Sequence, residues 1–231
     1  MNDWNASSPA KILSMSSQGG LGRGNLGAVV ARAGVGKTAC LIHIGLKRLL
    51  EGERVVHISL KEGPDKVSAY YALIFAELAR TLPPDEQKRL QAVMEKKRMI
   101  LAYLNQSFDV ARLRANLVNL RDHLGFSADL LMIDGLDFEQ VSREDLEAFK
   151  AFAAEWGVEI WFSVLSHRHL HETNARGVPQ PLDALDDFFG VILQLHPEPS
   201  GIYLKFLKDH DAPAAPEASW RLDPNTYLVL S

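Results

Sequence analysis

The stretch VVARAGVGKTACLIHIG, residues 29–45, decides the fold, because an apolar run is broken by a glycine-rich segment and then resumes. A lone cation, Lys37, lies between the two apolar runs. A lysine at the edge of a core costs free energy unless a negative group meets it. Gly34 and Gly36 allow backbone angles and close approaches that other residues resist. The segment therefore predicts a strand, an anion-binding turn and a helix.

The pattern ARAGVGKT, residues 31–38, matches the P-loop except that Ala31 takes the place of the first glycine. In a P-loop, backbone N–H groups and the N-terminus of the following helix surround phosphate oxygens. We therefore expect Lys37 to meet the β- and γ-phosphates of ATP, and the Thr38 hydroxyl to bind Mg²⁺. The alternative is an ordinary strand–helix turn with an exposed lysine. The residues expected to hold the nucleotide are Ala33, Gly34, Val35, Gly36, Lys37, Thr38 and Ala39.

A second metal ligand is expected at Asp134, which ends the apolar run LLMI at residues 130–133. A carboxylate in this position, the Walker B position, holds Mg²⁺ through its waters. The alternative is an aspartate that begins a turn before Gly135. Asp137 lies just beyond and could also contribute to the metal site, but a turn role is favoured.

Short apolar runs alternate with helical patterns along most of the chain, which predicts an α/β fold with a mostly parallel sheet covered by helices on both faces. From residue 201 the pattern alternates and carries turn residues, so we expect antiparallel strands that extend the sheet at one edge. Residues 1–18 are expected to be a flexible segment, and residues 19–231 a single domain.

Composition narrows the classes of function. The chain has 231 residues and a net charge of −4, which gives no general attraction to nucleic acid or to an anionic membrane. Its single cysteine excludes an internal disulfide, and no apolar run is long enough to span a bilayer. We expect a cytoplasmic protein without a membrane partner.

The order of these parts resembles the RecA/KaiC/DnaB superfamily, and the KaiC-like ATPases most closely, over about residues 19–230. The resemblance rests on GGLGRGNLGAVVARAGVGKT at residues 19–38, HISLKEG at residues 57–63 and SWRLDPNTYLVL at residues 219–230. It implies a RecA-type P-loop fold that binds ATP and Mg²⁺. It also implies a homo-oligomer built head to tail, for which a hexamer is expected.

The resemblance also implies catalytic residues. Glu62 is implied as the base that polarises the attacking water, with Lys61 in the place of the family's first glutamate. The alternative is that both are a solvated loop pair. His167 stands where the family has a polar sensor of the γ-phosphate. A zinc site over HRHLH, residues 167–171, is the less favoured interpretation, because no cysteine or second pair accompanies it.

A further implied residue acts between subunits. Lys208 stands where the family carries a basic residue that reaches the neighbouring subunit's nucleotide. His210 departs from the family, which has Arg or Lys there, so charge stabilisation would be weaker and dependent on pH. The alternative is an ordinary surface lysine on an antiparallel strand.

The expected function is ATP hydrolysis that acts on a macromolecular partner, either DNA or another protein. The alternative is a protein that binds ATP as a regulatory or assembly ligand without hydrolysis, which the irregular Lys61–Glu62 pair keeps open. A small-molecule kinase ranks last, because no clustered arginine lid is present. Basic residues that could contact DNA are better explained as solvated helix faces. They are residues 95–99, Arg112, Arg114 and Arg121.

Overall fold

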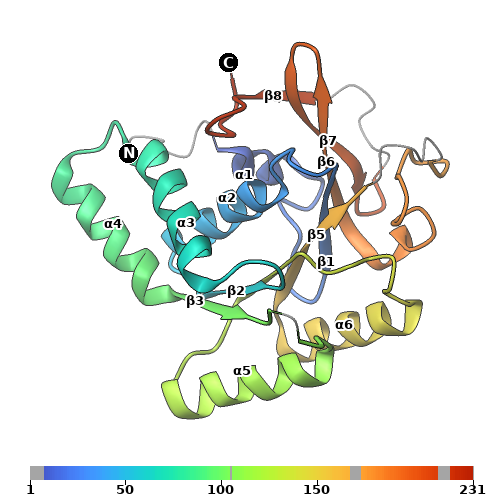
Figure 1. The fold of residues 1–231 in the computed structure, drawn as a ribbon, viewed down its shortest axis with the longest axis horizontal. Helices are drawn as coiled ribbons and strands as arrows, with labels where there is room; N and C mark the ends of the chain where they lie inside the picture. The colour runs from blue at the N-terminus through green and yellow to red at the C-terminus, as the bar shows by residue number, and fades with distance from the viewer. Residues whose placement is uncertain (1–7, 105, 167–172, 213–218, 231) are drawn as a thin grey trace.

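The computed structural model describes residues 8–104, 106–166, 173–212 and 219–230, which form a sheet with helices on both faces (Figure 1). The strands are β1 (Leu26–Ala31), β2 (Val55–Ser59), β3 (Arg98–Ala102), β4 (Leu130–Asp134), β5 (Glu159–Leu165), β6 (Phe189–Glu198), β7 (Gly201–Asp209) and β8 (Ser219–Leu222). The helices are α1 (Pro9–Ile12), α2 (Lys37–Leu50), α3 (Pro64–Ala79), α4 (Pro84–Lys97), α5 (Val110–Leu124) and α6 (Arg143–Trp156), with short 3₁₀ turns η1 (Leu13–Met15) and η2 (Asp186–Phe188).

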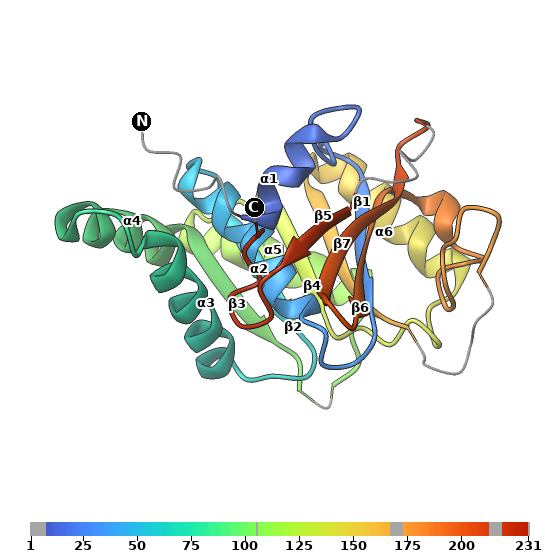
Figure 2. The same ribbon diagram turned by 90° about the horizontal axis from the view of Figure 1, so that it is seen from above.

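The eight-stranded sheet has the order β3-β2-β4-β5-β1-β6-β7-β8. The strands from β3 to β6 in this order are parallel, whereas β6 pairs with β7, and β7 with β8, in antiparallel fashion. This confirms the α/β class with a mostly parallel sheet and an antiparallel extension at one edge. Figure 2 shows α3 and α4 on the opposite side of the molecule from β6 and β7. The carboxyl ends of β1, β2, β4 and β5 share one edge, where a ligand is expected to bind.

Two apolar cores lie on the two faces of the sheet. Side chains alternate along a strand, so Val29 and Ala31 of β1 face one core while Ala28 and Val30 face the other. The first core is covered by α1, α2, α3 and α4, and the second by α5 and α6, which lie together in Figure 1. This burial on both faces explains why the central strands consist almost wholly of apolar residues.

The segment expected to be flexible, residues 1–18, is described from Ser8 onward. There α1 packs against α2, and Ala10 and Ile12 are buried in the first core. The Ser8 hydroxyl caps α1 and also lies 3.4 Å from Nδ1 of His43 on α2. The described part of this segment therefore belongs to the packed domain.

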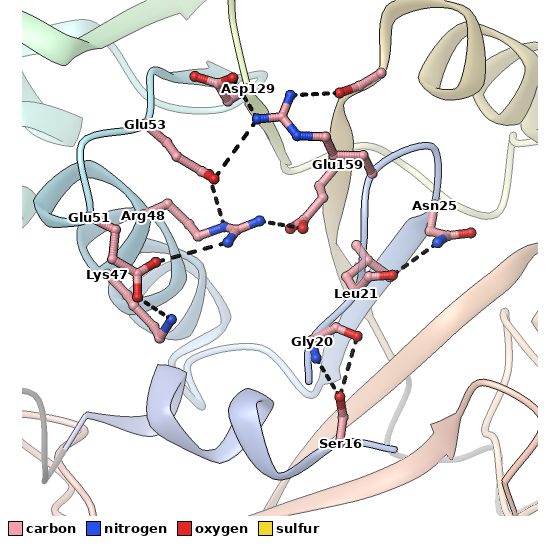
Figure 3. A network of polar contacts seen from close by, with 12 residues as sticks. Ser16, Gly20, Leu21, Asn25, Lys47, Arg48, Glu51, Glu53, Asp129 and Glu159 are labelled. Carbon is pink, nitrogen blue, oxygen red and sulfur yellow. Dashed lines mark hydrogen bonds and ion pairs between the residues drawn. The ribbon is translucent and has the colours of Figure 1, made fainter. Parts of the chain in front are cut away.

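A network of charged residues joins the C-terminal end of α2 to the amino ends of β4 and β5 (Figure 3). Arg48 in the last turn of α2 forms ion pairs with Glu159, the first residue of β5, and with Glu53. Arg23 pairs with Asp129, directly before β4, at 2.8 Å. The network lies at the opposite edge of the sheet from the turn between β1 and α2, so it positions strands rather than a ligand.

Candidate functional site

The glycine-rich turn joins the carboxyl end of β1 to the N-terminus of α2. Gly34 and Gly36 have φ angles of +74° and +104°, which L side chains rarely adopt. Gly36 is the N-cap residue of α2 and supplies no side-chain cap, so the first N–H groups of the helix are left to other partners. A helix N-terminus with unused donors favours an anion. The turn therefore combines two positive-φ glycines with a helix N-terminus that no side chain caps.

Lys37, the first residue of α2, is a half-buried cation, and no carboxylate among the described residues forms a hydrogen bond with it. Its Nζ donates to the backbone carbonyls of Ala31 and Arg32, at 3.0 and 2.9 Å. Burial and the nearby charge of Lys61 lower the pKa of Lys37 to about 8, although the negative charge of Asp134 opposes them. An anion placed in this turn would favour the charged ammonium.

Thr38 and Asp134 come from distant parts of the sequence and meet at the same edge of the sheet. Thr38 Oγ1 donates to Asp134 Oδ2 at 2.8 Å. Asp134 ends β4 and is nearly buried. A hydroxyl and a carboxylate oxygen are ligands that Mg²⁺ prefers, and this ion takes only one or two carboxylates when phosphates supply the rest. The donor set fits that ion, although the described residues contain no cluster of three or more His, Cys, Asp or Glu suited to a metal.

A cavity of about 510 Å³ opens beside the turn. One wall is the glycine-rich turn with the start of α2, and the other is an apolar face of α3 together with the C-terminal turn. Its lining residues are Gly34, Gly36, Lys37, Thr38, Ala39, Glu62, Tyr70, Leu73, Ile74, Pro224, Asn225 and Tyr227. The cavity thus combines phosphate-type donors with apolar surface, which is the usual character of a cofactor site.

Tyr227 is a site residue that the sequence did not indicate. Its ring packs directly on Gly36, where an added Cβ would lie only 1.9 Å from Cε1 of the ring. Tyr227 also has a φ of +57°, an outlier for a bulky residue. The C-terminal turn that carries Tyr227 is held in two ways. Asp223 accepts hydrogen bonds from backbone N–H groups within this turn, and His43 Nε2 lies 3.1 Å from the Thr226 carbonyl. The sequence does not show this contact, because it depends on the C-terminal segment folding back onto the glycine-rich turn.

Glu62 lies in the cavity wall, just beyond β2. Its side chain accepts a hydrogen bond from Lys66 at 2.8 Å, and its backbone N–H donates to the Ser59 hydroxyl at 3.1 Å. The neighbouring Lys61 packs its aliphatic chain against Gly135, directly after Asp134. The structure therefore brings Glu62 to the cavity that the glycine-rich turn lines, with its carboxylate paired to a lysine in the first turn of α3.

Lys208 does not meet the glycine-rich turn of its own chain. It pairs in register with Ile192, which in turn pairs with Ala28, so it lies toward the amino end of β1. Its Nζ donates to the Asp186 carbonyl at 2.7 Å. His167 and the rest of residues 167–171 lie outside the described residues, whereas Ser166 donates its N–H to the Ala31 carbonyl at 3.0 Å.

The arginines of α5 that could contact DNA are engaged within the chain. Arg114 pairs with Glu155 at 2.6 Å, and Arg121 pairs with Asp122 at 2.8 Å. Arg112 donates to the Ser107 carbonyl at 2.7 Å. These contacts favour the interpretation of α5 as a solvated helix face over that of a DNA-binding surface.

Comparison with known proteins leaves the site to be judged on its geometry. The chain matches no protein-family model, and no curated protein matches it. Among the described residues, no helix has the length and apolar character needed to cross a membrane.

Proposed function

We propose that this chain binds ATP with Mg²⁺ at the turn between β1 and α2. The observation that carries the proposal is the meeting of Thr38 with Asp134, 2.8 Å apart, at the mouth of a glycine-rich turn that also presents Lys37. In this proposal the backbone N–H groups of residues 33–39 and the Lys37 ammonium hold the phosphates. Thr38 and Asp134 hold Mg²⁺, which would neutralise phosphate charge.

The apolar wall of the cavity suits the nucleoside part of the ligand. Tyr70, Leu73 and Ile74 of α3 face the same cavity as Tyr227. Leu73 is 60% exposed and Tyr70 is 38% exposed, so apolar surface of α3 lies open at this cavity. A base placed here would cover apolar surface while its phosphates reach Lys37.

We further propose that the bound ATP is hydrolysed slowly, with Glu62 as the base that orients water. Its position in the cavity wall supports this role, since a base must come within hydrogen-bond reach of the water. The competing candidate is a protein that binds ATP without hydrolysing it. The ion pair between Glu62 and Lys66 favours that candidate, because it engages the carboxylate with a lysine instead of leaving it to the attacking water. Release of inorganic phosphate by the purified wild type separates the two.

The fold supports a proposed place among RecA/KaiC-like ATPases. The supporting features are the P-loop on β1, the Asp134 carboxylate at the end of β4 and the antiparallel strands β7 and β8 at one edge. In that proposal subunits assemble head to tail, and Lys208 of one subunit serves the nucleotide of the next. Mixing Lys208→Ala with Lys37→Ala subunits should then restore activity that neither has alone. Co-assembled mixtures that stay inactive would exclude this arrangement.

The macromolecular partner is proposed to be DNA or another protein. Turnover of ATP with and without DNA is the direct test. Stimulation by DNA supports a nucleic-acid partner. Equal rates would favour a protein partner or the regulatory role.

A further inference from the structure

His57 is a fully buried histidine on β2, beside the proposed metal site. In register it lies opposite Met132, two residues before Asp134 on the adjacent strand β4. Residues paired in register share a face, and alternate residues along a strand share it too. His57 and Asp134 therefore point to the same side of the sheet, the side covered by α2 and α3. The imidazole has 0% relative exposure.

The two ring nitrogens of His57 differ in their surroundings. Nδ1 lies 3.3 Å from the hydroxyl of Tyr71, a fully buried residue of α3. Nε2 has no hydrogen-bond partner among the described residues, and it lies 4.0 Å from Asp134 Oδ2. Buried polar atoms without partners are rare, and each one needs an explanation. The unpartnered atom here faces the carboxylate on which the proposed function depends.

The arrangement selects one tautomer of His57. A proton on Nε2 points a donor at Asp134, whereas a bare lone pair there would face a carboxylate and be repelled. The Tyr71 hydroxyl can then donate to Nδ1. Tyr71 thus fixes the tautomer, as outer-shell partners of metal sites commonly do.

Asp134 Oδ2 has one donor in this structure, the Thr38 hydroxyl. Under the proposed function, on which this inference rests, the Thr38 oxygen binds Mg²⁺ through a lone pair and keeps its proton for Asp134. A carboxylate offers about four lone-pair sites, so a single donor does not fix its orientation. Nε2 of His57, 4.0 Å from Oδ2, is placed to supply a second donor.

We propose that His57 is the positioning residue of Asp134: its Nε2–H holds the carboxylate in the orientation that binds Mg²⁺, and Tyr71 holds His57. His57 acts through Asp134 and does not touch the nucleotide. Packing of the imidazole alone would not require Nε2 to lie 4.0 Å from Oδ2.

The test is calorimetric titration of ATP into the full chain, once with Mg²⁺ and once with EDTA. The quantity compared is the gain in affinity that Mg²⁺ gives. His57→Leu should reduce this gain by about tenfold or more and leave the affinity in EDTA unchanged. His57→Gln keeps an amide donor near the Nε2 position and should retain most of the gain. His43→Leu is the matched control, because His43 is also buried but faces Ser8 and Thr226; it should alter both conditions equally.

The outcomes separate this proposal from the proposed function. A wild type that binds no ATP, or gains nothing from Mg²⁺, overturns the proposed function and with it the role of His57. Two results overturn only the role of His57. In the first, the wild type gains affinity from Mg²⁺ and His57→Leu gains as much. In the second, His57→Leu loses the same affinity with Mg²⁺ as with EDTA. If His57→Leu does not fold, Tyr71→Phe takes its place: it should lower the gain and leave the EDTA affinity unchanged, and an unchanged gain overturns the role.

Nuclear magnetic resonance of the imidazole nitrogens gives a second readout that needs no nucleotide. The His57 signals are assigned by their loss in His57→Gln. A proton on Nε2 in the wild type is expected. A proton on Nδ1 would overturn the proposal.

Discussion

The Thr38 hydroxyl donates to Asp134 Oδ2 at 2.8 Å, although 96 positions of sequence separate the two residues. Thr38 lies in the first turn of α2 and Asp134 at the end of β4, and β5 lies between β4 and β1 in the sheet. The contact therefore depends on the parallel arrangement of the strands, whose carboxyl ends meet at one edge. It places the proposed metal ligands within reach of a single cation.

Asp134→Asn should weaken ATP binding in Mg²⁺ by about tenfold or more and leave binding in EDTA nearly unchanged. The reason is that the carboxylate acts on the nucleotide through the ion. Calorimetry under both conditions measures the difference. A folding role would instead weaken binding equally in Mg²⁺ and in EDTA.

Binding of ATP should depend on pH through Lys37. The pKa of Lys37 in the free protein is lowered to about 8, and bound phosphates favour the charged form and raise it again. Affinity should therefore change little through this group below pH 8 and fall above it, by about tenfold per pH unit at most. Calorimetry in buffers of different ionisation enthalpy should show proton uptake on binding at pH 9.

Lys37→Arg is the control for this pH dependence. A guanidinium stays charged over the whole range, so the fall in affinity above pH 8 should disappear even if binding is weaker. An undiminished fall in Lys37→Arg would assign the titration to another group.

Glu62→Gln should keep ATP binding but slow phosphate release by roughly a hundredfold or more, as loss of a general base tends to do. Lys66→Gln is its matched control, because it removes the ion-pair partner of Glu62 and leaves the carboxylate. That variant should turn over ATP at least as fast as the wild type. Unchanged turnover in Glu62→Gln would exclude Glu62 as the base.

Gly36→Ala should destabilise the chain through two separable effects. The φ of +104° strains any L residue, and the added methyl would overlap the Tyr227 ring. The strain alone should cost about 1 kcal/mol or more in the free energy of unfolding. In the Tyr227→Ala background the overlap is gone, so the same substitution should cost less, with a coupling of about 0.5–3 kcal/mol. Urea unfolding of the four proteins gives this coupling, and a value of zero would contradict the packing of Tyr227 on Gly36.

The local elements of the site could be predicted from the sequence because their signals are local. The glycines of the turn require positive φ angles, and apolar runs such as that before Asp134 mark buried strands of a parallel sheet. The antiparallel edge was likewise predictable, because the residue pattern changes from continuous to alternating after residue 201. Each of these inferences needs only the residues that lie next to one another in the chain.

The remaining features depend on contacts between distant segments. Tyr227 reaches Gly36 only because the C-terminal turn folds back across α2. His57 looks like one more residue of an apolar strand until β2 and β4 are paired in register. The role of Lys208 was inferred from the resemblance alone, and its contact with the nucleotide of a neighbouring subunit stays a prediction.

The central claim is that Lys37 and its turn bind the phosphates of ATP, and calorimetric titration of MgATP into wild type and Lys37→Ala tests it most directly. Lys37 is the one side-chain cation among the described residues that line the cavity. Its loss should therefore remove most of the affinity while thermal unfolding shows that the variant is folded. Saturable binding by the wild type and little or none by Lys37→Ala is the predicted result. Equal binding by the two proteins, or none by the wild type, would contradict the account.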